Sequence, residues 1–101
     1  MSKHDPKYLA WIRTQPCAAC WFPAPCDPAH QRILGNGGIS IKPPDYDALP
    51  LCRRCHEKEH MGSITFWGQS SKERTREFVQ ALCDKHIKRF EEEDGEKEET
   101  E

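Results

Sequence analysis

The sequence predicts a small α+β domain in which two short strands and flanking helices are held together by a metal ion. The chain has 101 residues, of which only 36% are apolar. A core this small rarely stabilises a domain without a further cross-link. Six cysteines are present, four of them in two Cys-x-x-Cys pairs. Short strand-like stretches also lie between stretches of helical pattern, which favours the α+β class.

The chain can be divided into its expected elements. A first helix is expected after Asp5-Pro6, because aspartate caps helices well and proline suits the first helical position. Strands are expected at 28–34 and at 48–51, joined through glycines that favour a tight turn or a phosphate-facing loop. The second strand leads into a helix at about 54–61. Residues 1–90 are expected to form a single domain with its core at about 17–62.

A C-terminal helix is expected at about 71–90. Ser70 and Glu73 have the spacing of a capping box. Apolar residues then recur at helical intervals, at Phe78, Val79, Leu82, Ile87 and Phe90. Cys83 and His86 fall on or beside this stripe and are expected to be packing residues.

Charge is divided unevenly along the chain. Residues 91–101 hold eight acidic residues and one lysine, a local net charge of −7. Since the whole chain has 17 acidic and 15 basic residues, residues 1–90 hold nine acidic and 14 basic ones, a net charge of +5. The acidic end is expected to be a disordered tail. The basic body suits a polyanion such as DNA as a partner.

The cysteines are expected to bind zinc. No secretory leader pattern or run of 18 apolar residues is present, so a cytoplasmic protein without a membrane partner is expected. In that compartment, paired cysteines favour metal over disulfides. Cys17, Cys20, Cys52 and Cys55 would form a closed, structural four-sulfur site. Cys26 is expected to be a packing residue or a substitute ligand, and His56 or His60 could also replace a cysteine.

A second, more open metal site is expected beside the first. On a helix, His56 and His60 lie one turn apart on one face, about 5–6 Å between their β-carbons, so both can hold one ion. The segment between the cysteine pairs is 31 residues long, longer than the roughly 15–20 of compact zinc ribbons. It carries His30, Asp45 and Asp47. This combination predicts a small metal-dependent nuclease.

The motif from Ala29 to His60 resembles the HNH endonuclease family. It consists of Ala29-His30, a glycine-rich turn, and the run Leu49-Pro50-Leu51-Cys52-Arg53-Arg54-Cys55-His56 followed by His60. The resemblance covers roughly residues 7–67 and extends to small phage and prophage nucleases. It implies the ββα-metal (His-Me finger) fold, with two strands and a helix around one divalent ion.

By this resemblance, His30 is the general base, and His56 and His60 hold Mg²⁺ or another ion such as Mn²⁺ or Ni²⁺. Four basic residues would grip the DNA backbone: Arg32, Lys42, Arg53 and Arg54. The sequence departs from the family at Ala29, where a ligand is usual, and it lacks the central asparagine. Either the ligand position is empty or His30 is itself a metal ligand. Asp45 or Asp47 would orient His30 or complete the metal shell, or both could simply cap a turn. The alternative is a non-catalytic, zinc-stabilised module that binds nucleic acid or protein.

Overall fold

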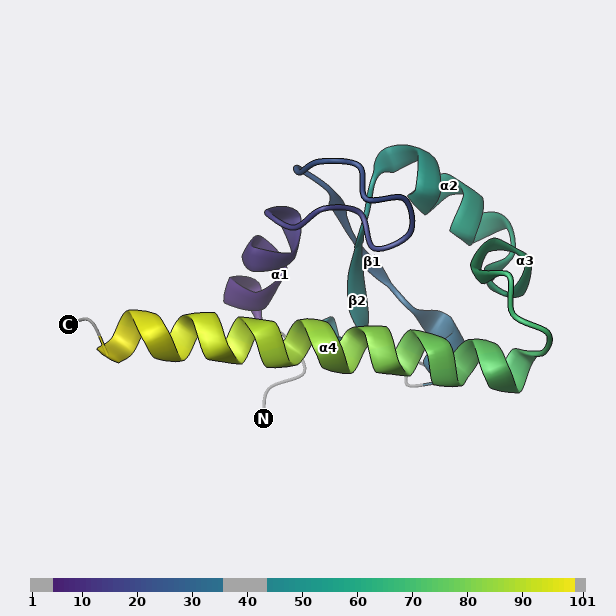
Figure 1. The fold of residues 1–101 in the computed structure, drawn as a ribbon. Helices are drawn as coiled ribbons and strands as arrows, with labels where there is room; N and C mark the ends of the chain where they lie inside the picture. Colours follow the sequence, from purple (N-terminus) through teal and green to yellow (C-terminus); the bar gives the residue numbers. More distant parts are fainter. Residues whose placement is uncertain (1–4, 36–43, 100–101) are drawn as a thin grey trace.

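A computed structural model describes residues 5–35 and 44–99, with side chains up to residue 93. It has the predicted α+β class, with helices packed around a two-stranded sheet (Figure 1). The elements are α1 (Pro6–Arg13), β1 (Asp27–His30), β2 (Ala48–Leu51), α2 (Arg53–Met61), α3 (Ser63–Trp67) and α4 (Lys72–Glu99). Short 3₁₀ turns, η1 (Arg32–Leu34) and η2 (Asp45–Asp47), follow β1 and precede β2.

The two strands pair antiparallel, with Asp27 opposite Leu51 and His30 opposite Ala48. All four residues of β2 are buried, whereas in β1 only Ala29 is. The first strand was predicted to run to residue 34, but it ends at His30. Ile33 and Leu34 both pack against the core instead of alternating across a sheet, and this is possible because η1 turns the chain towards α4.

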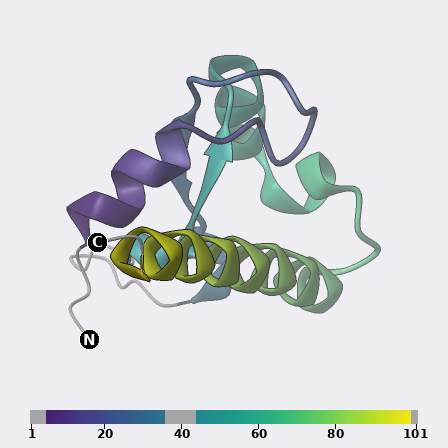
Figure 2. The same cartoon turned by 60° about the vertical axis from the view of Figure 1, so that its left-hand side comes forward.

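Helix α1 begins as predicted at Asp5, whose carboxylate accepts a hydrogen bond from the Tyr8 backbone N–H at 3.1 Å. Tyr8 and Ile12 are fully buried. Aromatic contacts join this helix to α4, with Phe90 lying 5.1 Å from Tyr8 between ring centroids. The Trp11 indole N–H also donates to Glu93 at 2.8 Å. The two helices thus cover the end of the domain beside the sheet (Figure 2).

Helix α4 extends to Glu99, although an end near Phe90 and a disordered acidic tail were predicted. Repulsion between the acidic side chains of this segment is outweighed, because glutamate and lysine are good helix formers. A helix that has already formed also extends at little cost. The N-cap residue of α4 is Ser71 and not the predicted Ser70, because the Ser71 hydroxyl accepts a hydrogen bond from the Arg74 backbone N–H at 3.1 Å.

Cys83 and His86 are buried on α4, as the prediction of packing residues requires. None of the helices in the described part of the chain is long and apolar enough to span a membrane.

Stability is expected to fall in mild acid because of His86. Burial lowers the pKa of this imidazole below its usual 6.5. The unfolded chain therefore binds a proton first, so stability is unaffected above the unfolded pKa and is lost as pH falls below it. Melting temperatures at about pH 7.5 and 5.5, with zinc in excess, should diverge more for the wild type than for His86→Gln. If the melting temperature changed equally between the two pH values in both proteins, His86 would be excluded as the source of the acid sensitivity.

Candidate functional site

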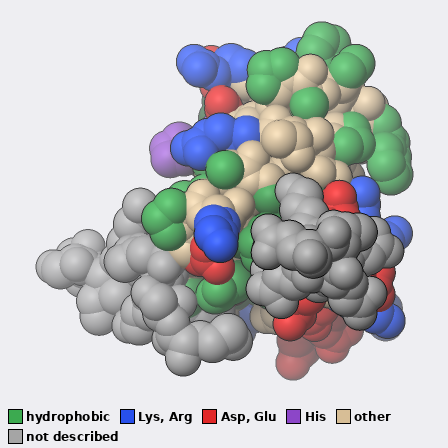
Figure 3. Space-filling model, turned by 90° about the vertical axis from the view of Figure 1, so that its left-hand side faces the viewer, with side chains coloured by type: hydrophobic (Ala, Val, Ile, Leu, Met, Phe, Trp, Pro, Cys, Tyr) green, Lys and Arg blue, Asp and Glu red, His purple; other side chains and the backbone are tan. Residues whose placement is uncertain are grey.

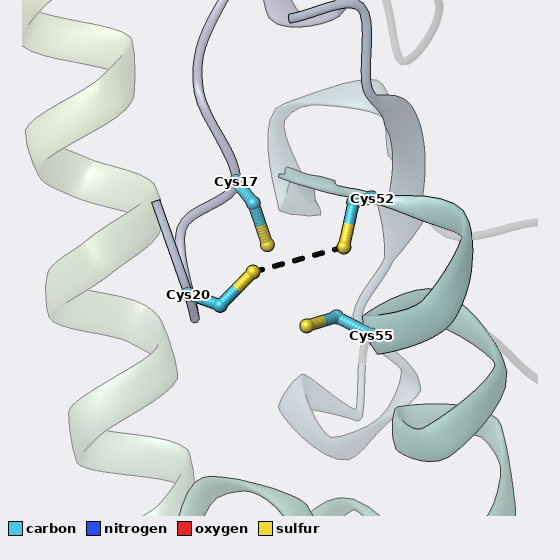
Figure 4. Close-up of side chains that lie close together, drawn as sticks. All are labelled: Cys17, Cys20, Cys52 and Cys55. Atoms are coloured by element: carbon cyan, nitrogen blue, oxygen red, sulfur yellow. Dashed lines mark hydrogen bonds between the residues drawn. The ribbon is translucent and has the colours of Figure 1, made fainter. Parts of the chain in front are cut away.

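Four cysteine sulfurs come together between the first Cys-x-x-Cys segment and the start of α2 (Figure 4). The sulfurs of Cys17, Cys20, Cys52 and Cys55 lie within 4.8 Å of one another. The sulfurs of Cys20 and Cys52 are 3.7 Å apart. A tetrahedral site with Zn–S bonds of about 2.3 Å places its sulfurs about 3.8 Å apart. The cluster therefore has the composition and size of a structural zinc site, as predicted.

Backbone hydrogen bonds hold the two cysteine pairs in place. The Cys17 N–H donates to Phe22 O, and the Trp21 N–H donates back to Cys17 O, both at 2.9 Å. The Ala18 N–H donates to Pro50 O at 2.8 Å, which ties the first pair to β2. Cys52 is the N-cap residue of α2. An ion bound by these cysteines would thus connect the N-terminal segment, the sheet and α2.

Metal binding at this cluster would be linked to the protonation of the cysteines. Burial tends to raise the pKa of Cys17, but hydrogen bonds from backbone N–H groups, chiefly that of Cys52, lower it to about 7. Burial, with hydrogen bonds to the neighbouring sulfurs, raises the pKa of Cys55 well above its usual value. Four thiolates in one cluster repel one another, and a divalent cation removes that repulsion.

The alternative zinc ligands do not take part in this cluster. Cys26 is buried and lies near Phe22 O, and burial raises the pKa of its thiol to about 11. It is a packing residue, as predicted first. Among the described residues, His56 and His60 are also absent from the cluster. The four cysteines of the two Cys-x-x-Cys pairs are enough for a four-coordinate zinc site.

His30 at the end of β1 is held by a buried carboxylate. Its Nε2 lies 2.9 Å from Asp45 Oδ1. Asp45 is only 2% exposed, and its other oxygen accepts from the Asp5 backbone N–H at 2.7 Å. The His30 side chain remains 18% exposed. Of the two candidate aspartates, Asp45 contacts His30 through its carboxylate, and the backbone oxygen of Asp47 accepts from the Gln31 N–H at the end of the sheet.

His56 and His60 line a groove of about 640 Å³ between α2 and β1. His56 Nδ1 lies 3.4 Å from Asp27 Oδ2, and Arg53 Nε donates to the same oxygen at 3.1 Å. Asp27 was not predicted as a site residue. Apart from the cysteine cluster, the described residues include no other group of three or more histidine, cysteine, aspartate or glutamate side chains placed to hold a metal ion. The histidine pair therefore shares its groove with the carboxylates of Asp27 and Glu57, but these side chains are not preassembled as a metal site.

The position of His30 on β1 can be compared with that of the groove lined by His56 and His60. Pro28 is among the residues that line the groove with His56 and His60. Side chains two residues apart on a strand point to the same face and are separated by about 7 Å. His30 is thus expected to lie one step along the same face of β1. A histidine beside basic side chains is visible on the molecular surface in Figure 3.

The predicted DNA-binding residues lie in different places. Arg53 lines the histidine groove, and Arg54 is exposed on α2. Arg32 is exposed in η1 and lines a different groove, next to α3 and α4. Lys42 lies outside the described residues, as do the glycines at 37 and 38.

The chain was compared with known proteins. A family model described as "Protein of unknown function (DUF968)" matches residues 1–89. The chain is also similar to "Uncharacterized protein YdfU" of Escherichia coli (strain K12), with 45% identity over 60 residues. This match covers 59% of the chain and 17% of that relative. No solved structure matches the chain.

These findings correct the resemblance to HNH endonucleases, and with it the inferred phage origin. The matching family and the relative are both uncharacterised, and neither is described as an HNH protein. The run Leu-Cys-x-x-Cys-His does not identify one family, because any cysteine knuckle that opens a helix after a buried strand has a similar pattern. It identifies the cysteine cluster rather than a family. The chain belongs to the DUF968 family of proteins of unknown function.

Proposed function

We propose that the chain is a zinc-stabilised, metal-dependent endonuclease that hydrolyses DNA phosphodiester bonds. The observation that carries the proposal is the His30–Asp45 pair at 2.9 Å. Pro28, two residues before His30 on β1, lines the groove of His56 and His60, so His30 is expected to lie close to that groove. A partly exposed imidazole held by a buried carboxylate is a suitable general base.

His30 would accept the proton of the water that attacks the scissile phosphorus. A neutral imidazole can accept this proton. Asp45 would hold the ring in position and stabilise the imidazolium that forms. The bond to the 3′-oxygen then breaks, and this oxygen takes a proton from solvent to give a 3′-hydroxyl and a 5′-phosphate.

The groove beside His30 offers ligands for a divalent ion. His56, His60 and Asp27 supply imidazole nitrogens and a carboxylate, a mixed donor set that suits Mn²⁺ and Ni²⁺ and can accept Mg²⁺. When bound there, such an ion would supply positive charge to the phosphate and the leaving oxygen. Arg53 would have to release Asp27 for the carboxylate to serve as a ligand. Arg13, which also lines the groove, adds positive charge near the phosphate.

Removing the imidazole of His30 is the test of the proposal. Plasmid nicking by His30→Ala, measured with Mg²⁺, Mn²⁺ and Ni²⁺, should fall by about 10²–10⁴-fold, the usual contribution of a general base. The matched control is His86→Gln, which removes a buried histidine from α4 and should retain nicking at pH 7.5 and above. Both proteins should keep zinc and helical content. Unchanged nicking by His30→Ala would exclude the proposed base.

A zinc-stabilised module that binds nucleic acid without cleaving it is the second candidate. The observation that favours it is the engagement of Asp27 by Arg53, which occupies the nearest carboxylate to His56. Folded, zinc-loaded protein that binds DNA but does not nick it with any of the three metals would support this candidate.

A further inference from the structure

A second groove, of about 660 Å³, lies between η1, α3 and the start of α4, which meet at one end of the molecule (Figure 1). Three basic residues line it: Arg32, Lys72 and Arg76. The hydroxyl residues Ser63 and Thr65 also line it, and no acidic residue is among the described residues of its wall. A wall that combines cations and hydroxyls without a carboxylate favours an anionic ligand.

The basic residues come from two separate elements that pack together. Arg76 Nε donates to the Ile33 backbone oxygen at 2.8 Å, which fixes the arginine against η1. Lys72 is the first residue of α4, where the unpaired backbone N–H groups add positive potential. The arrangement is therefore set by the packing of α4 on η1 rather than by neighbouring positions in the sequence.

Glu59 contacts Ser63 at the rim of the groove, and its carboxylate is already engaged. The Ser63 hydroxyl donates to one of its carboxylate oxygens at 2.8 Å, and the Gln31 amide donates to the other at 3.3 Å. These bonds hold the carboxylate on the protein side, which leaves the three cations to dominate the groove.

The basic groove and the histidine groove are lined by residues that follow one another in the chain. Met61 lines the histidine groove, and Gly62 and Ser63, the next residues of the chain, line the basic groove. On the other side, Arg32 follows His30 by only two residues, about 7 Å of chain at most. A polymer with regularly spaced phosphates could therefore contact both grooves at once.

We infer that the basic groove binds the phosphate backbone of duplex DNA to one side of the cleavage site. This inference rests on the proposed nuclease function for its ligand. The groove has no aromatic side chain on which a base could stack, and its apolar part consists of Ile33 and Ile64. Arg76 already uses Nε on the backbone of η1. These features suit contacts to phosphates, which fix position and do not read sequence.

The salt dependence of DNA binding tests the inference. Affinity for a fluorescein-labelled 20-base-pair duplex is measured without added divalent ions, from 50 to 200 mM salt. Each phosphate contact contributes about 0.9 to the slope of log affinity against log salt. The Arg32→Ala/Lys72→Ala variant should lower that slope by about 1.8 and weaken binding on duplexes of unrelated sequence alike. Arg76 is left in place because it supports η1.

The matched control removes two positive charges elsewhere on the surface. Arg74 and Lys88 are exposed on α4 and do not line the groove, so Arg74→Ala/Lys88→Ala should change the slope much less. Equal effects of the two double variants would overturn the inference. So would full relief of duplex binding by millimolar inorganic phosphate or a free nucleotide, since the groove would then be a small-anion site.

The binding measurement tests the groove inference, and the nicking measurement tests the proposed nuclease function, so the two can fail independently. If only the groove variant changes the salt slope and the wild-type protein never nicks DNA, then DNA binding by the basic groove is supported and the nuclease function is rejected. Nicking that depends on His30 without a specific slope change supports the nuclease and rejects the groove.

Discussion

Replacing Cys55 with serine is expected to abolish zinc binding and to unfold the domain. Structural zinc contributes about 10–16 kcal/mol to the folding of small zinc-finger peptides, which equals or exceeds the roughly 5–15 kcal/mol that stabilises a typical domain. Cys55 is buried in the first turn of α2, and its sulfur faces the other three (Figure 4). Loss of this ligand would detach α2 from the N-terminal cysteine pair.

The measurement is zinc content by metal analysis together with thermal unfolding followed by circular dichroism. Cys26→Ser is the matched control, because Cys26 is also buried but lies outside the cluster. It should retain one zinc per chain and lose only about 1–3 kcal/mol, the cost of burying a poorly paired hydroxyl. If Cys55→Ser melted cooperatively at the wild-type temperature without zinc, the cluster would not be a structural zinc site.

Replacing Asp45 with asparagine is expected to lower nicking by about 10²-fold or more while the domain stays folded. The substitution keeps the shape of the side chain but removes the negative charge that faces His30 Nε2. The imidazolium formed during proton transfer would lose its partner. An amide can also present an N–H group to the ring, which would stabilise the wrong tautomer.

The comparison of rate with stability separates this role from a structural one. Asp45→Asn should slow nicking while its melting temperature and zinc content stay close to those of the wild type. Asp84→Asn, at an exposed position on α4, is the control and should leave the nicking rate unchanged. A rate that falls only in proportion to a loss of folded protein would mean that Asp45 acts through the fold, for example through its hydrogen bond with the Asp5 N–H.

The parts of the site set by local spacing could be predicted from the sequence. Two Cys-x-x-Cys pairs have one common use in a chain with this composition, and the structure brings them together. Histidines four residues apart on a helix share a face whatever packs against it. Asp5 acts as a cap because its effect depends on the next three residues alone.

The parts set by tertiary contacts could not be predicted in this way. Asp27 lies beside His56 only because the strand register pairs Asp27 with Leu51, which brings it next to the start of α2. The sequence also left the choice between Asp45 and Asp47 open, because η2 determines which carboxylate reaches His30. No helix was predicted at α3, since its five residues are too few to show a helical period.

The central claim is tested most directly by the nicking of supercoiled plasmid by wild-type protein that holds one zinc per chain. The rate is compared with Mg²⁺, Mn²⁺ or Ni²⁺ added and with none added. The account predicts nicking that requires an added ion and produces 3′-hydroxyl and 5′-phosphate ends. No nicking with any of these ions, in protein that remains folded and zinc-loaded, would contradict it.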